Sequence, residues 1–155
     1  MYPQSHFLFS FLVVSVFVKL GVFDFRVALF VAIFAFLVDV DHFILFVSKF
    51  KDSSLRNAWN KAVYGKYAGR TFVHHWIGFL ILTVIIIGLY FYNLNWFWIV
   101  GLGYYTHMIL DYAHLNFLKI KGRLSLRFGG FVERIGKFEA LFDIFVLVGI
   151  ALVWI

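Results

Sequence analysis

The order of hydrophobic and polar residues divides this chain into long apolar runs joined by short polar connections. A helix needs about 20 apolar residues to cross a bilayer, where it satisfies its own backbone hydrogen bonds. Five runs are of this kind, at residues 6–23, 27–47, 72–92, 96–118 and 138–155. We therefore predict an all-α fold, a polytopic membrane bundle of about five transmembrane helices. The first run lacks a basic leader and a cleavage site of small residues, so we expect a retained helix rather than a signal peptide.

The composition supports a membrane protein and limits its architecture. Hydrophobic residues make up 63% of the 155 positions and charged residues only 14%, whereas a typical soluble domain has about 25% charged residues. This balance excludes an ordinary soluble protein, and the predicted helices use most of the chain. We therefore expect one integral membrane domain over residues 1–155. The chain has no cysteine, so any metal site must use nitrogen and oxygen ligands.

Two polar connections carry patterns of their own. Apolar residues recur at helical spacing between residues 53 and 66, which predicts an amphipathic cytoplasmic helix on the membrane surface or, alternatively, a connector packed against the bundle. These apolar residues are Leu55, Ala58, Trp59, Ala62 and Val63, with Ser53 or Ser54 as a candidate N-cap. Residues 123–130 alternate polar and apolar types and end in two glycines, which indicates a short hairpin or an interfacial arm.

The basic residues predict the orientation of the bundle. Of the 14 lysines and arginines, all but Lys19 and Arg26 fall in the connections at residues 49–70 and 119–137. Lysine and arginine gather in cytoplasmic loops, so we expect a multi-pass protein of the cell membrane with its N-terminus in the cytoplasm and its C-terminus outside. The net charge of +6 follows from this topology and favours anionic membrane lipids, not nucleic acid, as partners.

Ionisable residues inside the apolar runs form three compact clusters. An acidic side chain at the centre of a membrane helix costs about 2.5–3.5 kcal/mol, so such residues are usually functional and need partners that neutralise them. The predicted topology brings all three clusters to the cytoplasmic ends of their helices, where they can share one site. The clusters are Asp39, Asp41 and His42; His74 and His75; and His107, Asp111 and His114.

Helical spacing indicates which of these side chains share a face. His107, Asp111 and His114 lie within about 60° of one another on a helix, and positions 39 and 42 are also neighbours. Asp41 points away from that face unless the helix unwinds there, and in that case it can orient an imidazole. The pattern favours a site for a divalent metal ion, and a metal-free polar or proton-relay network is the alternative. We interpret His6, which stands alone, as an interfacial or hydrogen-bonded residue.

The order of three motifs resembles a known family. The motifs are Asp39-x-Asp41-His42, Arg70-x3-His74 and His107-x3-Asp111. They are similar to the motifs of the membrane-bound metal-dependent hydrolases, the YdjM-like inner-membrane proteins, over roughly residues 30–115. The chain departs from the family pattern at Val38, where the family has proline, and in the second motif, where Gly69 replaces a histidine. The resemblance implies a membrane protein whose Asp and His residues bind metal.

The ligand types suggest a reaction class. Aspartate and histidine without cysteine suit Zn²⁺, Mn²⁺ or Fe²⁺, and this number of carboxylates could hold one or two ions. A metal-dependent hydrolase acting on phosphoester-type bonds of lipids is our main hypothesis. A transporter or channel for divalent metal or protons is the alternative, although the outer halves of the helices carry few ionisable residues. A regulator with a structural metal is the third hypothesis.

Each candidate residue has an expected role. We expect metal ligands from all three clusters, a general base or a residue that orients a ligand from two carboxylates, and a phosphate clamp from one arginine, whose guanidinium pairs bidentately with phosphate oxygens. The expected ligands are Asp39, His42, His74, His75, His107, Asp111 and His114; the expected catalytic residues are Asp41, Asp143 and Arg70.

Overall fold

The computed structural model describes residues 2–63, 71–112, 123–128 and 131–155. This part of the chain is mainly helical, as predicted, with a two-stranded antiparallel hairpin before the last helix. The helices are α1 (Pro3–Lys19), α2 (Phe25–Leu37), α3 (Val40–Phe50), α4 (Leu55–Val63), α5 (Trp76–Tyr92), α6 (Leu94–Tyr112) and α7 (Lys137–Trp154). The strands β1 (Arg123–Phe128) and β2 (Phe131–Gly136) realise the hairpin alternative for this connection.

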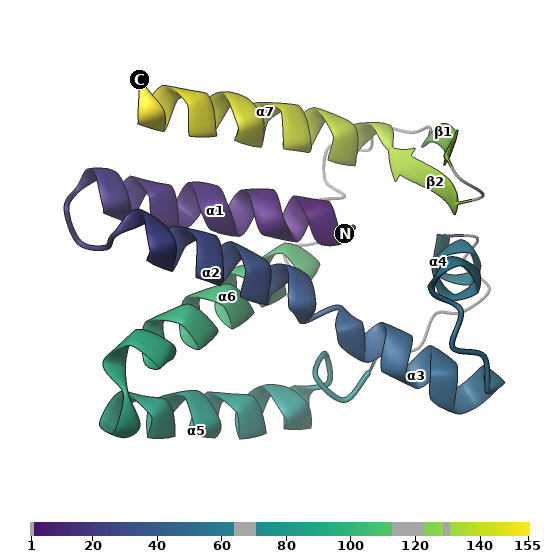
Figure 1. Cartoon of the computed structure of the whole chain (residues 1–155), viewed down its shortest axis with the longest axis horizontal. Coiled ribbons are helices and arrows are strands. Elements are labelled where there is room, and N and C mark those ends of the chain that lie inside the picture. The colour runs from purple at the N-terminus through teal and green to yellow at the C-terminus, as the bar shows by residue number, and fades with distance from the viewer. Residues whose placement is uncertain (1, 64–70, 113–122, 129–130) are drawn as a thin grey trace.

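Helix α1 is at the centre of the bundle. It packs against α2, α6 and α7, while α6 also packs against α2 and α5. Figure 1 shows the start of α1, the α3–α4 segment, the hairpin and the start of α7 at one end of the bundle. The α1–α2 turn, the α5–α6 turn and the C-terminus lie at the other end. The described parts of the two basic connections therefore share one end, as the predicted orientation requires.

Small residues allow the central helices to approach closely. Helix α1 buries Ser10 and Ser15, and α2 buries Ala28, Ala32 and Ala35, all with 0% exposure. On α6, Gly103 faces α2 so closely that an added Cβ would lie 3.0 Å from the Val31 carbonyl oxygen. Such contacts between backbones are typical of helix pairs in membranes, where small residues give the tightest packing. The α2–α6 pair is therefore held at a short, well-defined distance.

The second apolar run is not one straight helix. Helix α2 ends at Leu37, Val38 follows as its C-cap, and Asp39 is the N-cap of α3. Aspartate favours N-cap positions, but the Asp39 side chain makes no capping hydrogen bond, so its carboxylate is directed elsewhere. The unwinding that the sequence analysis made a condition for Asp41 is therefore present.

The membrane-spanning character of the helices is only partly established. In the described residues, one apolar helical stretch, Phe25–Phe50, is long and apolar enough to cross a bilayer. Helices α1 and α5 are apolar but have 17 residues each, slightly short of that criterion. The prediction of five transmembrane helices is thus not confirmed by length and composition alone.

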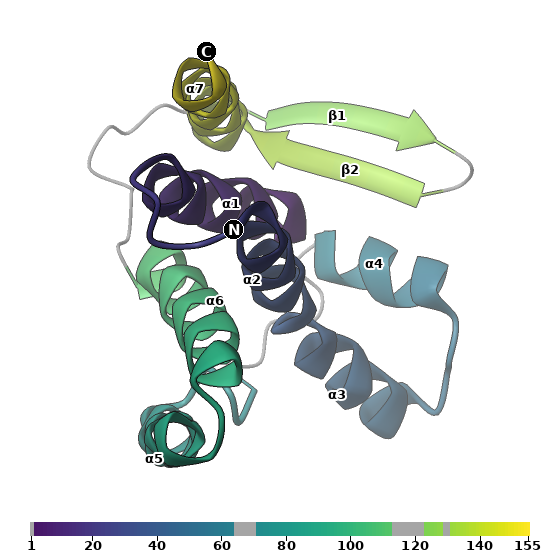
Figure 2. The same cartoon turned by 60° about the vertical axis from the view of Figure 1, so that its left-hand side comes forward.

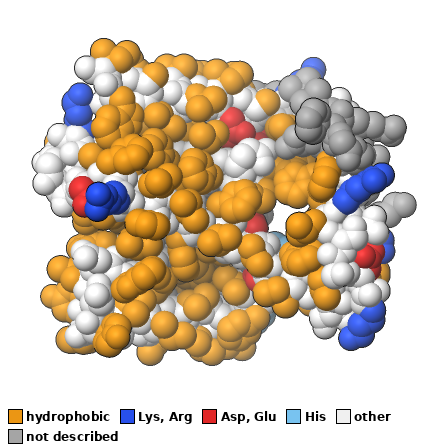
Figure 3. Space-filling view, in the orientation of Figure 1, with side chains coloured by type: hydrophobic (Ala, Val, Ile, Leu, Met, Phe, Trp, Pro, Cys, Tyr) orange, Lys and Arg blue, Asp and Glu red, His pale blue; other side chains and the backbone are white. Residues whose placement is uncertain are grey.

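The outer surface is strongly apolar. Helix α5 exposes large side chains along its length, such as Leu80 at 52% and Val84 at 69%. In Figure 3, hydrophobic side chains cover most of the face, while lysine and arginine side chains lie toward its two ends. Water-soluble monomers rarely expose apolar patches larger than a few hundred Å². This surface is suited to lipid.

Helix α4 confirms the predicted helical spacing of the first polar connection. Its N-cap is Ser54, whose hydroxyl accepts a hydrogen bond from the Asn57 amide at 3.3 Å. Ala58 packs with Phe46 of α3, and the Lys61 ammonium lies 3.8 Å from the centre of the Phe50 ring. Helix α4 also contacts β2, so it connects α3 with the hairpin at this end of the bundle (Figure 2).

Candidate metal centre

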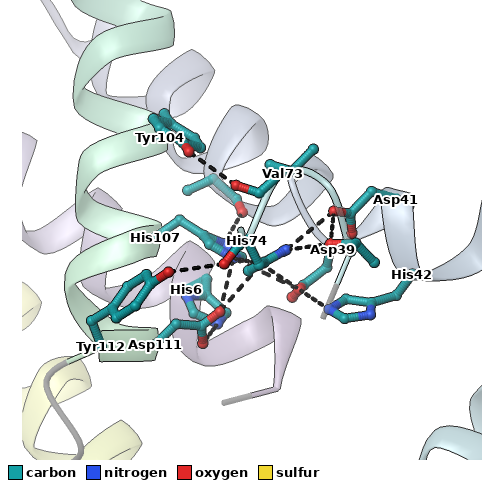
Figure 4. Close-up of polar contacts among 12 residues, drawn as sticks. His6, Asp39, Asp41, His42, Val73, His74, Tyr104, His107, Asp111 and Tyr112 are labelled. Atoms are coloured by element: carbon teal, nitrogen blue, oxygen red, sulfur yellow. Dashed lines mark hydrogen bonds and ion pairs between the residues drawn. The ribbon is translucent and has the colours of Figure 1, made fainter. Parts of the chain in front are cut away.

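Polar side chains from separate segments converge where α2 gives way to α3 (Figure 4). They come from the start of α3, from the segment before α5, from α6 and from the first turn of α1. Three groups of them place one ligand atom per residue within 4.8 Å of each other: His6, His107 and Asp111; Asp39, His74 and His107; and Asp41, His42 and His74. Shared members link these groups into one cluster, which we call the centre.

His107 of α6 is held in a defined orientation. Its Nδ1 lies 2.8 Å from the carbonyl oxygen of Ala35 on α2, and the residue has 0% exposure. A carbonyl oxygen only accepts hydrogen bonds, so Nδ1 carries the proton and Nε2 presents a lone pair to the centre. The close α2–α6 approach at Gly103 brings this carbonyl within reach. The local packing of small residues thus determines which nitrogen faces the centre.

His74 is oriented by its neighbours in the segment before α5. Its Nδ1 lies 2.7 Å from the Thr71 hydroxyl and 3.1 Å from Asp41 Oδ2, and the Thr71 hydroxyl itself donates to Asp41. Two tyrosines of α6 hold the backbone: Tyr104 donates to the Val73 carbonyl at 3.0 Å and Tyr112 to the His74 carbonyl at 2.8 Å. His74 Nε2 therefore also points into the centre.

The donor atoms in the middle of the centre lie close to one another. The Nε2 atoms of His74 and His107 are 3.0 Å apart, and Asp111 Oδ2 lies 3.2 Å from the first and 3.4 Å from the second. Asp39 Oδ1 completes the set at 4.0 Å and 3.7 Å from the same two nitrogens. Metal–ligand bonds of about 2.0–2.1 Å in a tetrahedron give ligand separations of roughly 3.3 Å. The four donors thus suit a divalent ion.

His42 and Asp41 lie at the edge of this donor set. The His42 side chain is 41% exposed, and its Nε2 is 4.0 Å from Asp39 Oδ1. Asp41 faces the far nitrogen of His74, the arrangement in which a carboxylate fixes the orientation of a ligating imidazole. The structure thus places Asp41 beside a ligand candidate, and His42 at the rim.

The remaining predicted site residues are not brought into the centre or lie outside the described residues. His75 is exposed and turns away, because its Nδ1 accepts the Ile77 amide at 3.4 Å and caps α5. Asp143 lies on α7 beside Ser5 and Glu139, not in any of the three ligand groups of the described residues. Arg70 and His114 are outside the described residues.

The sequence pattern left His6 as an interfacial or hydrogen-bonded residue and did not assign it to the site. This histidine has 0% exposure instead of an interfacial position, its ring stacks on His107 with centroids 3.8 Å apart, and its Nε2 is 3.3 Å from Asp111 Oδ1. It reaches the centre because α1 packs on α6, where Ser10 and Thr106 are joined by a 2.6 Å hydrogen bond. A lone histidine near the start of a helix carries no periodic signal. The small serines that follow it, Ser10 and Ser15, were the sequence feature that could have indicated close packing of α1.

A second polar cluster joins α1 to α7. Glu139 Oε1 accepts the Tyr2 amide at 2.5 Å and the Ser5 hydroxyl at 3.0 Å. Asp143, one turn along α7, also lies beside Ser5. We call Ser5, Glu139 and Asp143 the α1–α7 cluster. It has carboxylates, a hydroxyl and a backbone amide, and no imidazole among these groups.

Comparison with known proteins gives the chain a family. A family model described as YdjM inner membrane protein matches residues 1–116, three-quarters of the chain. The chain belongs to the YdjM inner membrane protein family. That match includes the residues of the centre on α1, α3 and α6 and in the segment before α5. No curated protein and no solved structure matches the chain. The family places the chain among inner membrane proteins, and its description names no reaction.

Proposed function

We propose that this member of the YdjM family is a metal-dependent hydrolase embedded in the inner membrane, acting on phosphoester-type bonds of lipids. The observation that carries the proposal is the pair of imidazole nitrogens 3.0 Å apart. His107 Nδ1 is engaged by a carbonyl, and His74 Nδ1 faces Thr71 and Asp41. If both imidazoles are neutral, their Nε2 lone pairs are directed at each other and repel unless a cation lies between them. The carboxylates of Asp39 and Asp111 approach the same two nitrogens, and two negative charges favour a divalent ion over a single proton.

The centre fits such an ion in its chemistry. Asp39, His74, His107 and Asp111 would hold it, and nitrogen and oxygen donors without sulfur suit Zn²⁺, Mn²⁺ or Fe²⁺. A bound ion of this kind would supply a Lewis acid and lower the pKa of water toward neutrality. Asp41 keeps His74 in its ligating orientation. His42, half-exposed at the rim, is placed to exchange a proton with a substrate or with water.

The proposal includes a polytopic bundle with the centre at the cytoplasmic leaflet. Helices α1 and α5 have 17 residues and are about 26 Å long, which fits a hydrocarbon core of about 30 Å after modest local thinning or snorkelling. The positive-inside rule favours a cytoplasmic location for the end that contains α4 and the hairpin. Substrate would then come from anionic lipids of the inner leaflet.

Single cysteines test this orientation, because the chain has none of its own. Ser125 in β1 and Asn95 in the first turn of α6 are both exposed. The hairpin and the start of α6 lie at opposite ends of the bundle (Figure 1). We expect Asn95→Cys to react with an impermeant thiol reagent in intact cells and Ser125→Cys to react only after the cells are opened. The reverse pattern would invert the topology and put the centre at the outer leaflet.

Lipid hydrolysis is tested with purified protein in vesicles of anionic phospholipid. We expect water-soluble phosphoester product only with added divalent metal, and loss of this product in His74→Ala because a ligand is removed. His75→Ala is the matched control: it alters the neighbouring histidine, whose side chain caps α5 outside the centre. Equal loss in both variants would contradict the assignment of the centre.

One observation favours transport as a second candidate. Buried hydroxyls follow His6 along α1, with Ser10 hydrogen-bonded to Thr106 and Ser15 buried nearer the opposite end. A polar track of this kind suits movement of protons or metal ions across the bundle. Uptake of divalent metal or protons into sealed vesicles, with no lipid cleaved, would replace the hydrolase proposal with transport.

A further inference from the structure

His6 is a fully buried imidazole with few polar neighbours among the described residues. Its exposure is 0%, its Nδ1 has no hydrogen-bond partner among them, and its Nε2 faces the Asp111 carboxylate at 3.3 Å. An unsatisfied buried polar group costs about 1–3 kcal/mol, so native proteins usually give it a partner, a water or an ion. The ring is fixed by stacking on His107, with centroids 3.8 Å apart and planes 19° apart. Its position is thus set by packing, which leaves Nδ1 without a partner among the described residues.

The charged atom that His6 faces is an oxygen of Asp111 that is not among the four donors in the middle of the centre. Asp111 directs Oδ2 at His74 and His107, at 3.2 Å and 3.4 Å. Its other oxygen, Oδ1, lies 3.3 Å from His6 Nε2. One carboxylate thus faces histidines with each of its two oxygens. A carboxylate that bridges two cations directs its two oxygens to different ligand groups in the same way.

The first cation position has its four protein donors without His6: Asp39, Asp111 Oδ2 and the Nε2 atoms of His74 and His107. We propose that His6 Nε2 and Asp111 Oδ1 form a second divalent-cation position beside the first, with Asp111 as the shared ligand. Two ions about 3.5–4 Å apart are a recurring device for phosphoryl chemistry, in which both ions contact the reacting phosphate. This inference rests on the metal centre of the proposed function, and not on the hydrolysis itself.

The two positions differ in the number of protein ligands. The first has four protein donors, whereas the second has two from the described residues and leaves its other coordination positions to water or to a phosphate oxygen. Fewer protein ligands give a weaker site, so the second ion binds after the first. A substrate phosphate that contacts both ions would then strengthen the second site.

Mn²⁺ provides a direct test, because its electron paramagnetic resonance distinguishes a single ion from a coupled pair. Chelator-treated protein in detergent is titrated with Mn²⁺ alone. We expect two binding steps, about two ions per chain at saturation, and a spin-coupled spectrum in the wild type. His6→Phe keeps an aromatic ring for stacking on His107, although a larger one, and removes the nitrogens. It should lose the second, weaker step and give the spectrum of an isolated ion.

Ser10→Ala is the matched control, because it alters another buried residue on α1 that faces α6 and should keep both ions. His6→Leu serves if the phenylalanine variant does not fold, as judged by its melting curve. Saturation of the wild type at one ion would overturn the second position and leave the first intact. Two ions in a folded His6 variant, or loss of both, would also overturn it. A wild type that binds no Mn²⁺ would overturn the metal centre as well.

Discussion

The two polar clusters that meet α1 satisfy their carboxylates in different ways. In the α1–α7 cluster, Glu139 accepts hydrogen bonds from the Tyr2 amide and the Ser5 hydroxyl, so fixed donors face the acceptor. In the centre, Asp111 faces three histidine nitrogens, at least one of which already presents a lone pair. Fixed donors therefore satisfy Glu139 in the first arrangement, whereas the donors of the second are grouped in a way that suits a metal ion. The types of partner, more than the number of carboxylates, are the reason that we propose only the second cluster as a metal site.

The largest difference is expected from removing one carboxylate in each cluster. Asp111→Ala deletes a ligand, so the metal content of purified protein should fall below about one tenth of the wild-type value, as elemental analysis will show. Glu139→Gln removes a carboxylate from the α1–α7 cluster and should leave metal content unchanged. Equal losses in the two variants would mean that the clusters are not functionally distinct.

Chelation extends the same comparison to stability. Metal bound only by the folded state at about 100 times its Kd adds about 2.7 kcal/mol, so chelation should lower the melting temperature by roughly 5–10 °C. This shift should be absent in Asp111→Ala and preserved in Glu139→Gln. A wild-type melting curve that chelation does not move, together with no stoichiometric metal, would favour the metal-free polar network.

A smaller effect is expected when the orienting carboxylate is changed and the ligands are kept. Asp41→Asn replaces the carboxylate that faces His74 Nδ1, so metal affinity should fall by about 10–100-fold while saturating metal still fills the site. Asp52→Asn is the control, because Asp52 lies between α3 and α4 and not in the centre. The Asp52 carboxylate accepts hydrogen bonds from the Ser54 amide and from the Asn57 side chain, and these bonds lower its pKa. Metal titration of both variants measures the difference. Unchanged affinity in Asp41→Asn would show that His74 needs no orienting partner.

The smallest effect concerns the helix packing behind the centre. A Cβ at Gly103 would meet Phe34 Cδ1 at 2.9 Å and the Val31 carbonyl oxygen at 3.0 Å, so Gly103→Ala should separate α2 from α6. We expect destabilisation of about 1–3 kcal/mol in thermal melts and weaker metal binding, because the Ala35 carbonyl moves away from His107. Gly88→Ala in α5 meets nothing within 4 Å and should not destabilise the protein. Comparable losses at both positions would exclude a specific role for the α2–α6 contact.

Local patterns in the sequence predicted the helical character of the chain and part of the centre, but not the division of residues 27–47 between α2 and α3. Apolar runs reveal helices because backbone and side-chain periodicity are local properties, and the i,i+4 spacing of His107 and Asp111 put their side chains together, with Nε2 and Oδ2 at 3.4 Å. The same spacing argument placed Asp39 near His42. The basic residues predicted which helix ends belong together, and the described ends agree.

Only the tertiary structure decided which of the adjacent histidines, His74 or His75, enters the centre. Their sequence positions are equivalent, but Tyr104 and Tyr112 hold the backbone so that one side chain turns inward and the other caps α5. The inclusion of His6 likewise depends on α1 packing against α6, a contact between segments 100 residues apart. Residue type and spacing therefore determined the helices and the ligand pairs within each helix. The close approach of helices through alanine, serine and glycine decided how those pairs combine, because that approach depends on contacts distant in the chain.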